Sequence, residues 1–352
     1  MGLMPHSRLT LLSVLATFSL SVGLIRCSTD EFSGTDAGTD APVGTDSATD
    51  APAPDTGTDA PRDVASDAIT DADAGPPANC DKLKAFGAPT KLTVSAVDVV
   101  VDVFGSFHID PTEKHAWFSQ SNQIRQYDVS GTTLTLDSTI PPIGSQRGFG
   151  VSANGLELVY TTPPANVVRY TRANLTSAWS NFVVVDVPMA APDGAAYQEY
   201  YHPSHLGNGP TFYFGRFVYY TSSPSEWDIV RATQTDAASY APVIQSGLHA
   251  NNFAFVNEPV LADDLTMYLA RWGDGITAYP RLARSTRANA QSPWSAPTAV
   301  PMPPLPFGPN DTLKPYAVTP DECALYFGYN PSVDGSASMS GPFTVYVARR
   351  PL

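Results

Sequence analysis

The chain has 352 residues, and 20 basic against 34 acidic residues give it a formal net charge of −14 at pH 7. This balance excludes a basic protein that binds nucleic acid through its charge. Residues 28–79 carry −11 of the total and residues 1–27 carry +2, so the remaining 273 residues carry only −5. A stretch of that length can bury a sizeable core without metals. Its few charges and many prolines indicate an all-β protein outside the cytoplasm.

Residues 1–27 have the pattern of a secretory signal peptide, with an apolar run over residues 9–24. The run ends at Cys27, which resembles the lipid-modified cysteine of a bacterial lipobox, although Arg26 departs from the small residue usual there. We expect export and a lipid anchor on Cys27, at the bacterial outer membrane or cell surface. The alternative is cleavage after the small-residue pair Ser21 and Gly23, which leaves the Cys27 thiol unmodified and gives a soluble periplasmic or secreted protein. No later segment reaches the ~20 apolar residues of a transmembrane helix.

Residues 28–79 form a linker of low complexity, composed mainly of Asp, Thr, Ala, Pro and Gly. Without apolar surface to bury, this segment cannot offset the entropy of ordering, and its Asp side chains repel one another. We expect a disordered tether that spans roughly 40 Å root-mean-square. One folded domain, residues 80–352, should follow it.

Two further cysteines, Cys80 and Cys323, stand near the two ends of the folded region. An even pair in an exported protein predicts a disulfide, which would close a loop of about 240 residues. Two buried thiols are the alternative.

The folded region repeats a turn followed by a strand, without sustained helical periodicity. The five copies are DPTEKHAWF, SANGLELVY, GNGPTFYF, ADDLTMYLA and TPDECALYF. Three central copies continue into another strand and then a Trp or Tyr among small residues, as in SPWSAP. A four-stranded repeat of roughly 40 to 60 residues predicts the blades of a β-propeller. The equivalent positions on the second strands are Trp117, Val159, Tyr213, Tyr268 and Tyr326.

The last repeat is incomplete, because the chain ends at TVYVARRPL where a fourth strand should follow. The start of the domain supplies a strand in FGAPTKLTV, residues 86–94. We therefore expect the N-terminal strand to complete the last blade and to remove an open sheet edge. In this arrangement Cys80 and Cys323 lie at the same end of the blade, which supports the predicted disulfide.

Two stretches carry a family resemblance: TPDECALYF followed by FTVYVARRP, and LADDLTMYLA followed by RLARSTRANAQSPWSAP. They resemble the WD-like propeller repeats of the C-terminal domain of TolB and of many secreted bacterial lipoproteins. No copy keeps the usual Ser-Pro-Asp-Gly turn whole. Five blades are the prediction, with six as the alternative if residues 94–106 form a further degenerate blade. The resemblance implies a scaffold function beside cell-envelope proteins.

The longest predicted loops share one face of the propeller, opposite the predicted disulfide. Long loops on a rigid scaffold usually carry recognition. We expect ligand contacts from residues that precede the innermost strands, namely Arg147, His202, Glu258 and Lys314. Aromatic candidates in the same loops are Tyr200, Tyr201, Tyr219, Tyr220 and Trp272. Alternatively, the polar residues pair with one another or with water, and the rings pack between sheets.

The sequence has no nucleophile elbow, phosphate loop or dinucleotide fingerprint, so we expect no cofactor. His202 and His205 have a spacing that can bind zinc, but no third ligand is indicated and we predict no metal. A glycoside hydrolase of the five-bladed arabinanase or levansucrase type is the rival hypothesis, with carboxylates Asp110, Glu199 and Glu258. Asp110 is expected in a turn on the wrong face. We therefore predict a monomeric, non-catalytic module that binds a protein or polysaccharide partner.

Overall fold

A computed structural model describes residues 80–102, 105–144, 148–163, 165–222, 224–248, 250–251, 256–271, 281–302, 311–331 and 342–352. Every regular element in these ranges is a β-strand, which confirms the predicted all-β class. The same ranges contain no helix long and apolar enough to cross a membrane. The predicted signal peptide, Cys27 and the linker over residues 28–79 lie outside the described residues.

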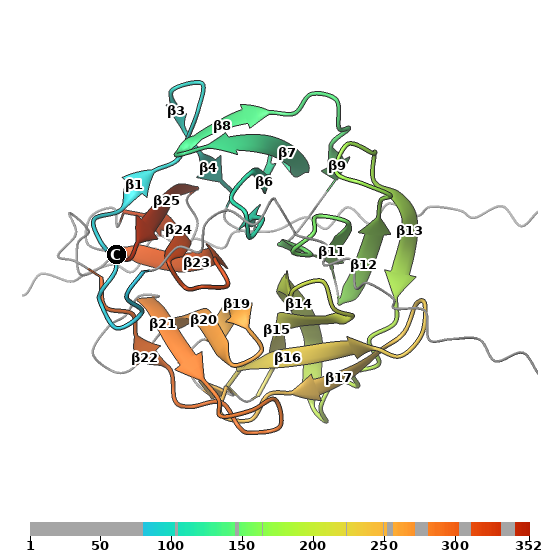
Figure 1. Cartoon of the computed structure of the whole chain (residues 1–352). Coiled ribbons are helices and arrows are strands. Elements are labelled where there is room, and N and C mark those ends of the chain that lie inside the picture. Colours follow the sequence, from blue (N-terminus) through green and yellow to red (C-terminus); the bar gives the residue numbers. More distant parts are fainter. Residues whose placement is uncertain are drawn as a thin grey trace, which may run out of the picture. The chain divides into compact units, whose positions relative to one another are not determined.

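The strands form five sheets, numbered here in chain order, which lie around a common centre (Figure 1). In each sheet four strands follow one another outward from that centre, in chain order in sheets 1 to 4. Sheet 1 contains β5 (Phe107–Ile109), β6 (His115–Gln120), β7 (Gln123–Ser130) and β8 (Thr133–Leu136), with β9 (Ile143–Gly144) beside β7. Sheet 2 contains β10 (Phe149–Val151), β11 (Glu157–Thr162), β12 (Asn166–Thr171) and β13 (Ser180–Val185).

Sheets 3 and 4 follow the same order. Sheet 3 contains β14 (Ala195–His205), β15 (Thr211–Tyr220), β16 (Glu226–Gln234) and β17 (Tyr240–Ile244), with β18 (Ala250–Asn251) beside β16. Sheet 4 contains β19 (Val256–Asp263), β20 (Thr266–Arg271), β21 (Arg281–Thr286) and β22 (Thr298–Ala299). Sheet 5 contains β23 (Thr312–Val318), β24 (Ala324–Asn330) and β25 (Phe343–Arg349), and its fourth strand is β1 (Thr90–Lys91).

The innermost strands neighbour one another in a ring. Strand β10 contacts β14, β14 contacts β19, β19 contacts β23, and β23 contacts β5. The ring closes between β5 and β10, where His108 Nε2 lies 2.6 Å from the carbonyl oxygen of Phe149. Sheets that radiate from such a ring have the propeller arrangement that the repeats predict.

A hydrophobic cluster fills each of the five junctions between neighbouring sheets. The clusters join sheets 1 and 2, 2 and 3, 3 and 4, 4 and 5, and 5 and 1. Side chains of a strand alternate between its two faces, so each sheet contributes to the junction on either side. A fully buried large apolar side chain contributes about 1.5–3 kcal/mol to folding. The stability of the domain is therefore distributed around the ring.

The five predicted second-strand positions are equivalent in the structure. They lie on β6, β11, β15, β20 and β24, and each is at most 1% exposed. In every sheet a residue at the end of the third strand donates its backbone N–H to a carbonyl in the turn between the first two strands. These donors are Val129, Arg172, Gln234, Arg287 and Arg350, and their acceptors are Lys114, Leu156, Pro210, Leu265 and Cys323. The sequence repeats thus correspond to repeated backbone geometry.

Strand β1 completes sheet 5, as the incomplete last repeat predicts. Strand β1 lies beside β25 (Figure 1), where Thr90 pairs with Val347 and Lys91 with Tyr346 in antiparallel register. Just before β1, the ring of Phe86 is 2% exposed and packs within the junction of sheets 4 and 5. The two ends of the domain are therefore built into one sheet.

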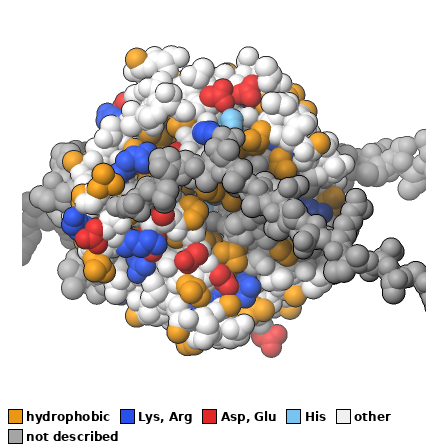
Figure 2. All heavy atoms as spheres, in the orientation of Figure 1, with side chains coloured by type: hydrophobic (Ala, Val, Ile, Leu, Met, Phe, Trp, Pro, Cys, Tyr) orange, Lys and Arg blue, Asp and Glu red, His pale blue; other side chains and the backbone are white. Residues whose placement is uncertain are grey.

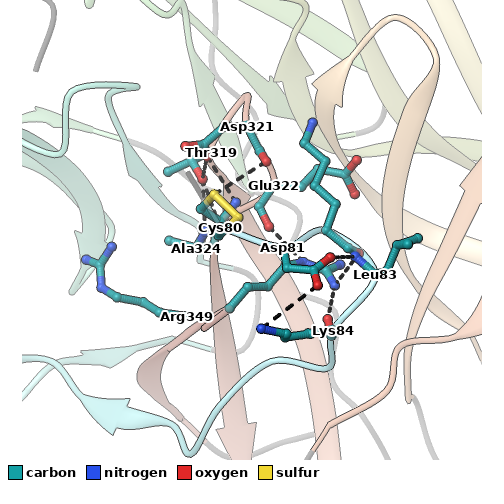
Figure 3. Close-up of a disulfide and its surroundings, with 12 residues drawn as sticks. Cys80, Asp81, Leu83, Lys84, Thr319, Asp321, Glu322, Ala324 and Arg349 are labelled. Atoms are coloured by element: carbon teal, nitrogen blue, oxygen red, sulfur yellow. Dashed lines mark hydrogen bonds and ion pairs between the residues drawn. A yellow bond between two sulfur atoms is a disulfide. The ribbon is translucent and has the colours of Figure 1, made fainter. Parts of the chain in front are cut away.

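A disulfide joins Cys80 to Cys323 across 243 residues, with 5.6 Å between their Cα atoms. Cys323 lies in the turn between β23 and β24. Asp81, next to Cys80 (Figure 3), donates its N–H to the carbonyl of Pro351. The predicted pairing is confirmed. A disulfide of this kind indicates an oxidising environment outside the cytoplasm.

Residues 93–101 form no sheet of their own. Strands β2 (Thr93–Val94) and β3 (Val97–Asp98) extend sheet 1 beyond β8, and β4 (Val100–Val101) pairs with β25 in sheet 5. This stretch, which the six-blade alternative requires as a separate unit, instead bridges the first and last sheets.

Candidate binding face

Sheet 3 has longer strands than its neighbours. Strand β14 has 11 residues and β15 has 10, whereas β11 and β20 have 6 each. The additional length lies toward the face at which the innermost strands begin. Two register shifts interrupt the pairing of β14 with β15, and His202 at the second shift has a φ of 44°. The segments AAYQEYYHPSH and GRFVYY, predicted as parts of long loops, are therefore strands.

One face of this extension is aromatic. Because side chains alternate along a strand, Tyr197, Glu199 and Tyr201 share a face of β14. The strand register places Tyr219 opposite Tyr197, Phe217 opposite Glu199, and Trp227 opposite Phe217. We define the aromatic face as Tyr197, Glu199, Tyr201, Phe217, Tyr219 and Trp227.

The rings of the aromatic face contact one another in series. Tyr197 stacks on Tyr219 with 5.1 Å between ring centroids, and Phe217 lies 4.7 Å from Trp227. Tyr201 lies 5.4 Å from Trp227 above Gly215, which has no side chain to separate them. Tyr197 and Tyr219 remain 44% and 39% exposed. The sheet thus presents a row of rings of which the outer pair is open to solvent.

The opposite face of the extension is buried against sheet 2. Tyr200 is 3% exposed and packs on Phe214, with 4.8 Å between ring centroids. Arg216 and Asp228 form an ion pair at 3.7 Å, and both side chains are at most 4% exposed. Glu226 accepts a hydrogen bond from the Tyr220 hydroxyl on this side. One face of the extension is therefore packed, whereas the other leaves the rings of Tyr197 and Tyr219 partly exposed to solvent.

A cavity of about 80 Å³ opens at the centre of the ring, toward the short turns between first and second strands. Residues from all five innermost strands line it, including His108, Val151, His205, Leu261 and Val318. Burial lowers the pKa of His108 to about 4. Burial, with smaller contributions from His108 and Arg169, lowers the pKa of His205 to about 3. Both rings are neutral at pH 7.

The structure places the predicted polar residues differently from the sequence analysis. His202, Glu258 and Lys314 lie within β14, β19 and β23 rather than before them. Each of these strands begins earlier in the chain than the apolar residues from which it was predicted. His202 is buried with Nδ1 3.1 Å from Ser106 Oγ, and Lys314 Nζ lies 4.4 Å from the centre of the Phe343 ring. Arg147 and the side chain of Glu258 lie outside the described residues. Ligand binding by these four residues stays a prediction.

The aromatic candidates separate into two groups. Tyr201 and Tyr219 belong to the aromatic face, whereas Tyr200 and Tyr220 lie on the packed side of sheet 3. The prediction of an exposed ring at Tyr200 is wrong, because the side chain points into the junction with sheet 2. Trp272 lies outside the described residues.

Two carboxylates of the hydrolase hypothesis, those of Asp110 and Glu199, lie on different elements of the described structure. Asp110 is in the turn after β5, where its carboxylate accepts hydrogen bonds from the Lys114 backbone and the Thr112 hydroxyl. Glu199 lies on the aromatic face of sheet 3. Among the described residues no three His, Cys, Asp or Glu side chains group into a metal site.

Sequence reasoning missed Tyr197, Phe217 and Trp227. The signal was present, because aromatic residues stand at alternate positions 217 and 219, and at 197 and 201 with Glu199 between them in the same alternation. Alternation of this kind is typical of a strand. The neighbouring Gly and Pro residues outweighed it and led to the prediction of loops.

No known protein family matches the sequence, and no curated protein matches it. Among solved structures, an α-L-arabinofuranosidase from Podospora anserina is 13% identical, with 79% of this chain and 94% of that chain covered and a TM-score of 0.43. A protein assigned as TolB from Agrobacterium tumefaciens is 11% identical, with 72% and 91% covered and a TM-score of 0.37. An α-L-arabinanase of Penicillium chrysogenum is 12% identical, with 75% and 96% covered and a TM-score of 0.40. These are distant β-propellers, and at such values the likeness carries no argument about family or function.

Proposed function

We propose that this protein is an exported, non-catalytic module whose aromatic face binds a glycan. The observation that carries the proposal is the exposed stacked pair Tyr197 and Tyr219, which continues into Phe217 and Trp227. An aromatic face offers apolar area to the C–H side of a sugar ring, and the tyrosine hydroxyl offers a polar edge. A protein partner is the alternative occupant.

The scaffold suits this function. We propose that the five sheets are five blades, which hold the rings on β-strands rather than on loops. Sites built on strands are more precise than sites built on loops. The rings also contact one another, so little side-chain entropy remains to be lost on binding.

The test is retention of the full chain on a panel of insoluble and immobilised polysaccharides, together with measurement of released reducing ends. Retention without release is expected. Tyr197→Ala and Tyr219→Ala should each weaken retention at least 10-fold, whereas Phe182→Ala, an exposed ring on β13, should not. Loss of retention in Phe182→Ala to the same extent, or no retention by the unaltered chain, contradicts the proposal.

Released reducing ends would favour the hydrolase hypothesis. In that case Glu199→Gln or Glu258→Gln should abolish the release while retention persists. Release that neither substitution changes would contradict this hypothesis as well.

The location of the protein at a membrane is a separate part of the proposal. We propose that Cys27 carries a lipid anchor and that residues 28–79 are a tether to the membrane surface. Cys27→Ser should abolish metabolic labelling with a radioactive fatty acid and move the protein to the soluble fraction. Unchanged fractionation and labelling of Cys27→Ser would contradict the anchor.

A further inference from the structure

We propose that a pocket between sheets 3 and 4 binds a small organic carboxylate through Arg231. This second site is independent of the proposed glycan site on the aromatic face. The pocket has a volume of about 220 Å³ and lies where β16 and β17 of sheet 3 face the segment between β21 and β22 of sheet 4. Its lining includes Arg231, Thr233, Val243, Ile244, Ser292 and Trp294.

The guanidinium of Arg231 is a partly buried cation without a counter-charge. Its Nε atom is buried and has no hydrogen-bond partner, and no carboxylate of the described residues forms an ion pair with it. Strand pairing places Arg231 directly across from Tyr213, which belongs to the hydrophobic cluster between sheets 3 and 4. Because side chains paired across strands share a face, Arg231 extends toward sheet 4. A cation held partly out of water favours an anion beside it.

The arginines at the same position in sheets 2 and 4 have partners on the next sheet. They are Arg169 and Arg284, each across from the equivalent residue of its second strand. Arg169 donates a hydrogen bond to the carbonyl oxygen of Ala237 at 2.6 Å. Arg284 donates to both carboxylate oxygens of Glu322, at 2.8 and 3.0 Å. This bidentate geometry is specific for a planar acceptor such as a carboxylate.

Among the described residues, sheet 4 supplies no such carboxylate to Arg231. Asp264 corresponds to Glu322, because each accepts a hydrogen bond from the buried second-strand tyrosine of the preceding sheet. The Asp264 side chain is one methylene shorter, and its carboxylate pairs with an arginine of its own sheet. A pocket therefore lies beside Arg231, whereas a carboxylate lies beside Arg284.

Other lining groups fit the remainder of a carboxylate ligand. The Thr233 hydroxyl accepts a hydrogen bond from Thr211, so its own proton remains for a ligand oxygen. Val243 and Ile244 line the pocket and are 58% and 45% exposed. They offer apolar contact to the body of a molecule whose carboxylate lies against Arg231. The ligand is therefore a small carboxylate with an apolar or aromatic body.

Surface charge in general does not account for such binding. On the face that Figure 2 shows, basic and acidic side chains of the described residues are scattered rather than gathered. The formal net charge of −14 opposes an anion at long range. Recognition of a carboxylate therefore depends on direct contact with Arg231.

The experiment measures binding of benzoate, benzamide and acetate to the full chain by isothermal titration calorimetry. We expect benzoate to bind at least 10-fold more tightly than benzamide, which lacks the charge, and than acetate, which lacks the apolar body. Arg231→Gln should remove the preference for benzoate over benzamide. Because Arg231 has no partner to lose, this substitution should leave the unfolding temperature within about 2 °C of that of the unaltered protein.

Two further variants test the location of the site. Arg169→Gln is the matched control, because Arg169 has the same position in sheet 2 and has its own partner there. Benzoate affinity should be unchanged in this variant. Val243→Glu places a carboxylate directly across from Arg231 on β17 and should weaken benzoate binding at least 10-fold while the arginine is retained.

Three results would overturn the inference. The first is equal affinity of the unaltered protein for benzoate and benzamide, or no binding of benzoate. The second is a preference for benzoate that survives in Arg231→Gln or in Val243→Glu, because the anion would then bind elsewhere. The third is an equal loss in Arg169→Gln, which would mean that the substitutions act through the fold as a whole rather than through this pocket.

Discussion

Three arginines occupy the equivalent position at the end of the third strand in sheets 2, 4 and 5. Each guanidinium lies 4.2 to 4.5 Å from the centre of an aromatic ring and donates a hydrogen bond to a carbonyl of the nearby turn. They are Arg172 over Trp179, Arg287 over Trp294 and Arg350 over Phe86. Each also donates to a side chain of the preceding sheet. These arginines therefore join neighbouring sheets.

Substitution of Arg287 measures how much such an arginine contributes to the free energy of unfolding. Its side chain is 2% exposed, it pairs with Asp264, and it donates to the Tyr213 hydroxyl of sheet 3. Arg287→Gln places there the residue that sheet 3 has at the same position, Gln234. We expect a loss of about 3 kcal/mol in the free energy of unfolding, because Asp264 loses its partner. Urea denaturation followed by tryptophan fluorescence measures this loss.

The control for this substitution is Arg125→Gln, since Arg125 donates to the neighbouring Gln123 in an exposed pair. A change within about 0.5 kcal/mol is expected for it. If Arg287→Gln changed stability no more than Arg125→Gln, the arginine would not be joining the sheets.

His205 makes stability depend on pH. Its ring is buried, neither ring nitrogen has a hydrogen-bond partner among the described residues, and burial holds its pKa near 3. In the unfolded chain the pKa returns to its usual value near 6.5, so only the unfolded state binds a proton between these values. The stabilising contribution is therefore complete above about pH 6.5 and is lost as the pH falls toward 3.

The expected loss from His205 at pH 4.5 is on the order of 2 kcal/mol relative to pH 7.5. His205→Gln should reduce the difference between unfolding free energies measured by urea at the two pH values. Burial raises the pKa of Glu157, whose carboxylate lies 3.8 Å from His205 Nε2, and this changes stability with pH in the opposite direction. Glu157 is present in both proteins. An undiminished difference in His205→Gln would show that another group causes the acid sensitivity.

At the scale of single residues, the aromatic positions were predictable and the polar contacts were not. Trp117, Tyr213, Tyr268 and Tyr326 repeat in the sequence because each fills the same buried space. The arginine contacts depend on which sheet lies next to which, and a sequence repeat of about 55 residues does not contain that information. The aromatic face of sheet 3 was missed for a different reason, because the strands that carry it were predicted as loops.

At the scale of elements, sheet 3 departs from the other sheets. Residues 191–205 and 215–227, where Gly, Pro and Ser are frequent, were predicted as loops, but backbone pairing continues to Tyr220 and Ala195. Register shifts allow this continuation, because each shift absorbs a residue without ending the ladder. Local composition therefore predicted the existence of these strands, and pairing with the neighbouring strand determined their length.

The turn after β17 packs sheet 3 against sheet 4. Trp294 donates its backbone N–H to the carbonyl of Ser246 and its indole N–H to Gln245. Gly247 in this turn has a φ of 86°, and a Cβ there would lie 2.3 Å from the carbonyl oxygen of Trp294. Only glycine fits both the backbone conformation and the contact.

Gly247→Ala should therefore lower the free energy of unfolding by about 1–3 kcal/mol, through backbone strain and displacement of Trp294. Thermal unfolding monitored by near-ultraviolet circular dichroism measures this effect. Gly131→Ala is the control, because Gly131 also has a positive φ but no atom within 4 Å of the added Cβ. An equal loss in both variants would mean that the backbone conformation alone, and not the close contact with Trp294, accounts for the loss of stability.

At the scale of the whole molecule, the ring depends on a sheet built from both ends of the domain. The incomplete last repeat and the strand near Phe86 made this closure predictable from the sequence. The disulfide followed from the same reasoning. Residues 93–101 were harder to place, because they divide their pairing between the first sheet and the last.

Replacement of both Cys80 and Cys323 by Ser should lower the free energy of unfolding by about 2–5 kcal/mol, since the closed loop of 243 residues restricts the unfolded chain. The double replacement avoids a new pairing with Cys27. The shift of the guanidinium chloride midpoint measures the effect, and the unaltered protein in excess reductant should show the same shift. Equal midpoints for the two proteins without reductant would mean that β1 and Phe86 suffice to close the ring.

The order of synthesis gives this closure a consequence in time. The ribosome makes β1 before every other strand, and β25, with which it pairs, is made last. At about 5–20 residues per second, roughly 12 to 50 seconds separate the synthesis of Cys80 from that of Cys323. During that interval the first strand has no partner in the chain, and it is the segment that an aggregating neighbour can reach for longest.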